Sequence, residues 1–136
     1  MSKPIPHVQK FMTTCPITIG AEQPMLQAHR LMRAERIRHL PVLHGGKIVG
    51  IVSDRDLHLI ETLRDVDPEK ISVEEAMTPD PYCVSPDAPL DEVVMTMAER
   101  KYGCAVVQEQ GKVVGILTTV DVCRAFAELL QTRLAK

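Results

Sequence analysis

The stretch Gly46-Lys47-Ile48-Val49-Gly50-Ile51 occurs twice in the chain, the second time 65 residues later as Gly111-Lys112-Val113-Val114-Gly115-Ile116. Asp56 recurs at the same interval as Asp121. Because the interval is constant, the two copies align without a gap. An ungapped repeat of this length indicates one supersecondary unit used twice, each copy giving the other a face to bury. We therefore expect two similar halves related by pseudo-twofold symmetry, with any ligand cleft at the seam between them.

Each copy is expected to contain a short helical piece followed by the order β-α-β-β-α. The expected strands are short apolar runs next to Pro or Gly, and the expected helices carry apolar residues three and four positions apart. Pro24 and Pro89 suit the first turn of a helix, and Ser72 and Glu75 have the spacing of a capping box. In copy one the expected elements lie at 8–11, 17–19, 24–32, 40–43, 48–52 and 57–63, and in copy two at 72–76, 82–84, 89–97, 105–108, 113–117 and 122–134.

The expected fold class is therefore α/β of the α+β type, with two β-α-β-β-α repeats and small three-stranded sheets flanked by helices. Repeat 1 covers residues 8–63, a polar linker covers 64–70, and repeat 2 covers 71–134. A single copy has too few elements to cover both faces of its own sheet. Packing of the two repeats is thus part of the predicted fold.

Composition excludes several classes of protein. The 136 residues carry a net charge of −2 with dispersed basic residues, so no nucleic-acid partner is expected. No run approaches the roughly 20 apolar residues of a membrane span and no leader is recognised, so we expect a cytoplasmic protein without a membrane partner. The four cysteines lack metal-ligand spacing and are expected to be free, mostly buried thiols without metal. They are Cys15, Cys83, Cys104 and Cys123.

Two motifs in copy one resemble those of the CBS domain, a tandem pair of which is called a Bateman module. They are Ile37-Arg38-His39-Leu40-Pro41-Val42 and Gly50-Ile51-Val52-Ser53-Asp54-Arg55-Asp56. The resemblance extends from about Val8 to Phe126, and it is looser in copy two, where Tyr102-Gly103-Cys104-Ala105-Val106 replaces the usual pattern. It implies a regulatory module that binds AMP, ADP, ATP or S-adenosylmethionine in two clefts between the repeats.

The segment Ser53-Asp54-Arg55-Asp56 stands where a helix is expected to begin. The free N–H groups of a helix N-terminus favour a phosphate, a carboxylate can accept the ribose hydroxyls, and Arg55 can bind phosphate oxygens. The alternative interpretation is that Ser53 and Asp56 only cap their own helix. Thr118 and Asp121 repeat the pair, and the two roles are compatible.

By the resemblance, each cleft takes residues from both repeats. The first cleft would contain Ser53, Arg55, Asp56, Thr78, Tyr82, Cys83, Tyr102 and Gly103, with Arg38 reaching the phosphates. The adenine would lie near Tyr82, Cys83 and Tyr102. The second cleft would contain Thr118, Asp121, Thr13, Ile17, Thr18, Ile37, Arg38 and His39.

The second cleft has Val120 where the first has Arg55, so we expect it to bind phosphate more weakly unless Arg38 or His39 compensates. His39 could add charge beside a phosphate, or be a strand-end histidine bonded to backbone. The other histidines follow no ligand spacing and are expected at the surface. They are His7, His29, His44 and His58.

The leading functional hypothesis is an energy- or metabolite-sensing module with no obligatory cofactor and no catalytic residues. It would act on an unidentified effector protein in trans through conformational or oligomeric change. The alternatives are a sensor of S-adenosylmethionine, a structural dimerisation module with vestigial clefts, or an enzyme of phosphoester or nucleotide chemistry. No phosphate-binding Gly-Lys loop or zinc-protease motif supports the enzyme. A homodimer is expected because the closing helix of copy two carries a long apolar face. It is formed by Val122, Phe126, Leu129 and Leu130.

Overall fold

The computed structural model describes residues 4–133, which form two compact units. The middle unit consists of residues 16–81. The terminal unit combines the segment up to Cys15 with the segment from Tyr82 onward. The middle unit carries most of copy one and the terminal unit most of copy two. Within residues 4–133, no helix has the length and apolar character needed to cross a membrane.

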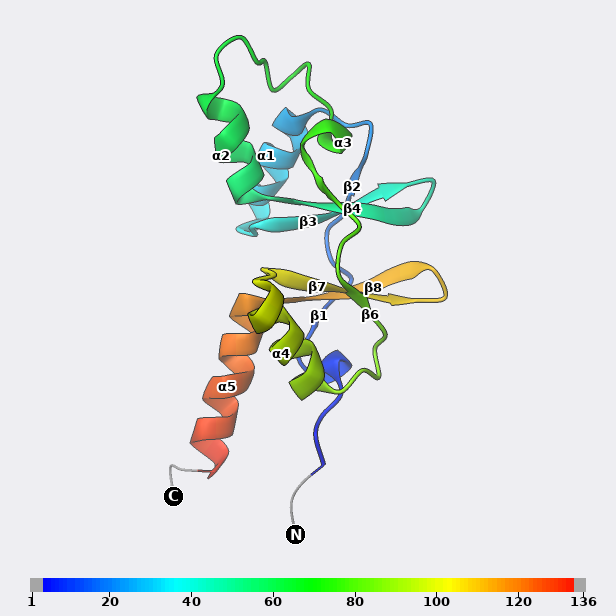
Figure 1. The fold of residues 1–136 in the computed structure, drawn as a ribbon, viewed down its shortest axis with the longest axis vertical. Helices are drawn as coiled ribbons and strands as arrows, with labels where there is room; N and C mark the ends of the chain where they lie inside the picture. The colour runs from blue at the N-terminus through cyan, green and yellow to red at the C-terminus, as the bar shows by residue number, and fades with distance from the viewer. Residues whose placement is uncertain (1–3, 134–136) are drawn as a thin grey trace. The chain divides into compact units, whose positions relative to one another are not determined.

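The middle unit has a four-stranded sheet with helices on one face (Figure 1). Its elements are β2 (Ile19–Gly20), α1 (Met25–Glu35), β3 (His39–His44), β4 (Lys47–Ser53), α2 (Asp54–Thr62), α3 (Val73–Ala76) and β5 (Thr78–Pro79). The strand order is β2-β3-β4-β5, with β2 parallel to β3 and the other pairs antiparallel. The buried core joins Met25, Ala28 and Met32 of α1 to Leu40, Val42 and Val52 of the sheet.

The terminal unit repeats this design with its own core. Its elements are η1 (Val8–Lys10), β1 (Thr13–Thr14), β6 (Cys83–Val84), α4 (Leu90–Arg100), β7 (Cys104–Glu109), β8 (Lys112–Thr118) and α5 (Thr119–Arg133). The strand order is β1-β8-β7-β6, with β6 parallel to β7. Val93 and Met97 of α4 pack with Ala105, Val107 and Leu117 of the sheet.

The expected three-stranded sheets are wrong, because each sheet gains a fourth strand from the other copy. Thr13 of β1 pairs with Ile116 of β8, and Thr78 of β5 pairs with Ile51 of β4. The short helix that precedes each exchanged strand is in the same unit as that strand, so η1 belongs to the terminal unit and α3 to the middle unit. The sequence repeats and the compact units therefore have different boundaries. Strands of two residues are too short to show the alternation that identifies a strand.

The repeated glycine of the opening motif makes room for this exchange. A Cβ at Gly50 would collide with Met77 and lie 2.8 Å from the Thr78 carbonyl oxygen. A Cβ at Gly115 would collide with the Met12 side chain. Met77 of copy two thus lies against Gly50 of copy one, and Met12 of copy one lies against Gly115 of copy two.

Several local expectations differ from the structure. Pro24 and Pro89 are the N-cap residues of α1 and α4, with extended backbone, rather than first-turn residues. Leu63 follows the end of α2 and is 54% exposed, so it does not join the core face. The cysteines are free but not mostly buried, because Cys104 alone is buried among the four.

The apolar face of α5 divides into two parts. Val122 packs on the core of the terminal unit, as the amphipathic pattern predicts. Phe126, Leu129 and Leu130 are 59%, 45% and 39% exposed, so they do not fold back onto this core. Leu134, which was expected to extend the face, lies outside the described residues.

Candidate functional site

In the middle unit, the candidate site begins at the N-terminus of α2, where Ser53 is the N-cap. The Asp56 backbone N–H donates to Ser53 Oγ (3.3 Å), and the Ser53 backbone N–H donates to Asp56 Oδ2 (2.8 Å). Ser53 Oγ also donates to Asp56 Oδ2, at 3.1 Å. Both bonds that the Asp56 carboxylate accepts end on Oδ2, and no donor among residues 4–133 reaches Oδ1. Asp56 is half-buried, so its Oδ1 lone pairs are available to a ligand hydroxyl.

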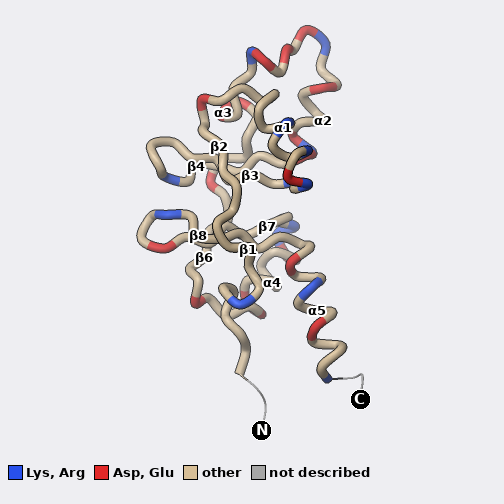
Figure 2. The backbone as a smooth tube through the Cα atoms, turned by 180° about the vertical axis from the view of Figure 1, so that it is seen from behind, with Lys and Arg blue, Asp and Glu red and all other residues tan. Residues whose placement is uncertain are grey.

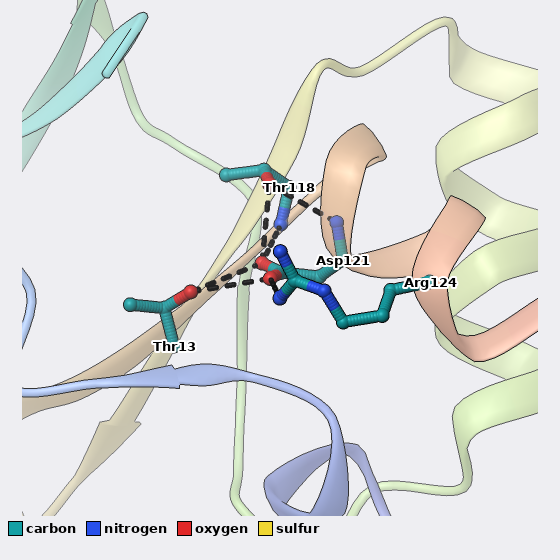
Figure 3. A network of polar contacts seen from close by, with 4 residues as sticks. All are labelled: Thr13, Thr118, Asp121 and Arg124. Atoms are coloured by element: carbon teal, nitrogen blue, oxygen red, sulfur yellow. Dashed lines mark hydrogen bonds and ion pairs between the residues drawn. The ribbon is translucent and has the colours of Figure 1, made fainter. Parts of the chain in front are cut away.

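The matching carboxylate in the terminal unit is buried and engaged on both oxygens (Figure 3). Asp121 is 3% exposed, and its Oδ2 accepts from the Thr118 N–H (2.8 Å) and from Thr118 Oγ1 (3.1 Å). Its Oδ1 accepts from Thr13 Oγ1 (3.2 Å) and from Arg124 Nη1 (3.5 Å). This carboxylate therefore fastens β1 to the start of α5, as well as capping the helix.

The two copies thus differ in how well they fit the capping and the ligand interpretations. Within residues 4–133, Asp56 accepts hydrogen bonds on one carboxylate oxygen, which caps α2, and accepts none on the other. Asp121 accepts hydrogen bonds from the protein on both oxygens. The residue before each aspartate differs as well, with exposed Arg55 in one copy and Val120, 62% exposed, in the other. Within residues 4–133, Arg55 forms no ion pair with Asp54 or Glu61, which contact histidines instead. Chemically, Asp56 Oδ1 can accept a hydrogen bond from a hydroxyl group, and Arg55 with the N–H groups of the α2 N-terminus can bind a phosphate.

Arg38 and His39 lie beside this terminus. The Asp54 backbone N–H donates to the Arg38 carbonyl oxygen at 2.9 Å, and His39 of β3 pairs with Ser53 of β4. Burial lowers the pKa of His39 below its ordinary value of 6.5, a larger effect than the opposite influence of Asp56. His39 is therefore neutral at pH 7 and supplies a hydrogen-bonding ring rather than a charge.

The terminal unit contributes an aromatic pair. The rings of Tyr82 and Tyr102 stack with centroids 5.3 Å apart, and Tyr102 is 40% exposed. Such a face suits a planar base. Burial raises the pKa of the neighbouring Cys83 thiol and, as the main cause, that of Cys104 to about 12, so these thiols are not nucleophiles at neutral pH. The Gly103 carbonyl oxygen accepts from the Thr119 N–H at the start of α5.

The remaining predicted residues are scaffold or surface within their own units. Ile17 and Ile37 pack against the middle core, Thr18 is half-buried, and Thr78 is exposed on β5. The first predicted group is divided, with Ser53, Arg55, Asp56, Thr78 and Arg38 in the middle unit. Its other members, Tyr82, Cys83, Tyr102 and Gly103, are in the terminal unit. The second group has Thr13, Thr118 and Asp121 in the terminal unit and its other members in the middle unit.

Two side chains near these sites differ from expectation. Arg124, which bonds Asp121, was not predicted, although its position three residues further along the same helix is the signal that would have found it. His29 was expected at the surface, but its side chain is only 30% exposed, and its Nδ1 lies 3.0 Å from Glu61 Oε1. His29 is on α1 and Glu61 is on α2, so the spacing of residues along the sequence does not indicate that they pair.

Two repeats that exchange edge strands, each with a Ser/Thr-x-x-Asp helix start, define a known class of module. The CBS domain family model matches residues 8–59 and 73–128. The chain belongs to the CBS domain family as a tandem pair.

Solved structures of CBS pairs have the same fold. A candidate acetoin utilization protein (AcuB) from Vibrio cholerae superposes with a TM-score of 0.85 at 31% identity, covering 97% of this chain and 98% of that one. The CBS domain pair of protein MJ0100, in complex with 5′-methylthioadenosine and S-adenosyl-L-methionine, gives 0.84 at 28% identity, covering 93% and 99%. CBSX2 in complex with AMP gives 0.79 at 27% identity, covering 91% and 98%.

A curated relative places a similar pair inside an enzyme. The chain is 35% identical over 123 residues to an inosine-5′-monophosphate dehydrogenase of Korarchaeum cryptofilum. The match covers 90% of this chain and 25% of that protein, so the chain spans about a quarter of its length.

Proposed function

We propose that this CBS pair is a regulatory module, not an enzyme, that binds an adenosine-containing ligand through the start of α2. The observation that carries the proposal is the half-buried Asp56, whose Oδ1 accepts no hydrogen bond from residues 4–133, beside the unpaired guanidinium of Arg55. A ribose hydroxyl would donate to Asp56 Oδ1. The phosphate of AMP, ADP or ATP would accept from Arg55 and from the helix N-terminus.

The similar structures support adenosine as the shared chemical group. One of them holds AMP, and another holds 5′-methylthioadenosine and S-adenosylmethionine. Arg55 favours a phosphate-bearing ligand over the positively charged sulfonium of S-adenosylmethionine. An adenine nucleotide is therefore the first choice for this chain, and S-adenosylmethionine is the alternative.

The proposal is tested by thermal unfolding with adenosine, AMP, ADP, ATP and S-adenosylmethionine. Ligand at a hundred times its Kd adds roughly 2.7 kcal/mol to the free energy of unfolding, a shift of several degrees in Tm. Asp56→Ala should abolish the shift. Glu75→Ala is the matched control, because it removes the capping-box carboxylate of α3, away from the proposed site, and should leave the shift intact. An unchanged Tm with all five compounds would exclude the proposed ligand class.

A second proposed property is self-association through α5. A change in the arrangement of the two protomers on ligand binding would then be sensed by an effector protein. The exposed side chains of Phe126, Leu129 and Leu130 favour it, since three large apolar groups on one helix end gain from being covered. We propose a cytoplasmic homodimer, a compartment consistent with four free cysteines. Sedimentation velocity of the protein and of Phe126→Asp tests this. A monomer of 15.1 kDa at tens of micromolar in the unsubstituted protein contradicts it.

A further inference from the structure

The middle unit contains a hollow that is not lined by Ser53 or Asp56, although it borders the proposed adenosine site and shares Arg38 with the first predicted cleft. It lies between the end of α1 and the start of α2 and has a volume of about 300 Å³. Buried Met32 and Leu57 belong to its apolar lining. Its polar lining residues include three arginines, Arg33, Arg36 and Arg38. The volume is at the lower end of the range for small-ligand sites.

The positive charge of this hollow is largely uncompensated. Within residues 4–133, none of the three arginines forms an ion pair. Asp54 is the single carboxylate in the lining, and its Oδ2 lies 3.5 Å from His58 Nε2. His29, also in the lining, contacts Glu61. Figure 2 shows several blue segments of Lys and Arg near α1, with red segments of Asp and Glu among them.

Comparison of the two copies shows that the fold does not require these arginines. At the same positions of copy two, 65 residues later, stand Ala98, Lys101 and Gly103. Both α1 and α4 have 11 residues and end at a left-handed residue, Arg36 with φ 56° and Lys101 with φ 59°. The same backbone therefore forms with a single cationic side chain in place of three.

We propose that this hollow binds a small polyanion of phosphate chemistry, carrying two or three linked phosphates. Guanidinium groups present planar pairs of N–H donors that match phosphate oxygens, and three arginines in the lining of one hollow suit several phosphates better than one. The nearby N-terminus of α2, a helix of nine residues, adds partial positive charge. The linked phosphates are either a free ion or the phosphate chain of a nucleotide, and the experiment separates these sources.

The experiment is a calorimetric titration of the full chain with inorganic triphosphate. The double variant Arg33→Ala with Arg36→Ala should weaken binding at least tenfold, because it removes the charged hydrogen bonds that these two arginines would donate to phosphate oxygens. Arg30→Ala, on α1 but outside the lining, and Lys101→Ala, at the Arg36 position of copy two, are the matched controls. Both controls should keep the affinity of the unsubstituted protein. Equal Tm values of all variants without ligand show that each folds.

The outcomes distinguish this site from the proposed adenosine function. No binding of triphosphate, or equal weakening by Arg30→Ala, overturns the polyanion site and leaves the Asp56 proposal untouched. Triphosphate binding that survives Asp56→Ala supports the polyanion site, even if no adenosine compound binds. If saturating ATP competes with triphosphate, the site takes the phosphate chain of a nucleotide. If ATP binds without competing, the site takes a free ion. Binding only of an acidic protein segment overturns the proposal.

Discussion

The middle and terminal units have the same backbone design but use their polar groups differently. At the start of α2, Asp56 has one carboxylate oxygen that accepts no hydrogen bond from the described part of the chain, and within that part Arg55 beside it forms no ion pair. At the start of α5, Asp121 is buried, and its oxygens accept from Thr13, Thr118 and Arg124. A group cannot be both fully satisfied by the protein and free to bind a ligand. The comparison therefore favours a stabilising role for the Asp121 copy of the motif, and it is consistent with the binding role that we propose for the Asp56 copy.

The largest expected effect is on the stability of the terminal unit. Asp121→Ala should lower the free energy of unfolding by about 2–4 kcal/mol, since it removes a helix cap and leaves the donors of Thr13 and Thr118 without an acceptor. Asp56→Ala should cost about 1 kcal/mol, because it removes only a cap at a half-buried position. Urea unfolding of both variants measures this. Asp121→Asn, which keeps one acceptor oxygen, is the control and should lie between. Equal losses at the two positions would erase the distinction between the copies.

The next effect is on ligand affinity at Arg55. A charged hydrogen bond to phosphate contributes about 1.5–3 kcal/mol, so Arg55→Ala should weaken AMP or ATP binding roughly tenfold to a hundredfold. Adenosine should lose little affinity, and the penalty should shrink at high salt. Calorimetric titration with AMP and with adenosine tests the prediction. Similar losses for both compounds would remove Arg55 from phosphate binding.

A smaller effect should separate the two glycines that accept the exchanged strands. Gly50→Ala meets the Thr78 carbonyl oxygen as well as Met77, and backbone cannot move aside easily. Gly115→Ala meets only the flexible Met12 side chain within close range. We expect overpacking costs of about 1–3 kcal/mol, with Gly50→Ala the larger. Thermal unfolding of both variants provides the measurement, and the opposite order would contradict the close approach of β5.

The smallest effect should be a pH dependence from His39. Its pKa is lowered in the folded state by burial, so below pH 6.5 the unfolded chain binds more protons than the folded chain. Stability should therefore fall as pH drops through 6.5 and below. Tm at about pH 7.5 and about pH 5.5 should differ less in His39→Gln than in the unsubstituted protein. His58→Gln, on the exposed side of α2, is the control and should keep the full difference.

Much of the fold could be predicted because the chain presents its hydrophobic pattern twice. The helix face formed by Met25, Ala28 and Met32 is confirmed as core, and the runs at β4 and β8 each place one residue, Val52 and Leu117, in a core. The exchange of β1 and β5 could not be predicted, since two-residue strands have no alternation and pair with distant segments. The strand pairings of the structure reveal it, together with the close approach of Met12 and Met77 to a glycine.

The candidate site was predictable as a set of residue types but not as a division of roles. Ser53 with Asp56 and Thr118 with Asp121 have the same local spacing, and both pairs cap a helix. What distinguishes them is Thr13, a residue 108 positions away from Asp121 that donates to its carboxylate. The resemblance to the family grouped Thr13 with Asp121 as ligand contacts. Local sequence cannot show that these two side chains bond each other, and their assignment as ligand contacts stays a prediction.

The exchange of β1 also sets an order for folding during synthesis. All residues of the middle unit lie between positions 16 and 81, so this unit can form as soon as that stretch has left the ribosome. The Thr13 strand is made earlier, but its partner β8 does not exist until Thr118 has been added. Throughout that interval β1 lacks its partner strand, and Val8 of η1 lacks the core residues that bury it. The first part of the repeat to be translated is thus among the last to reach its native place.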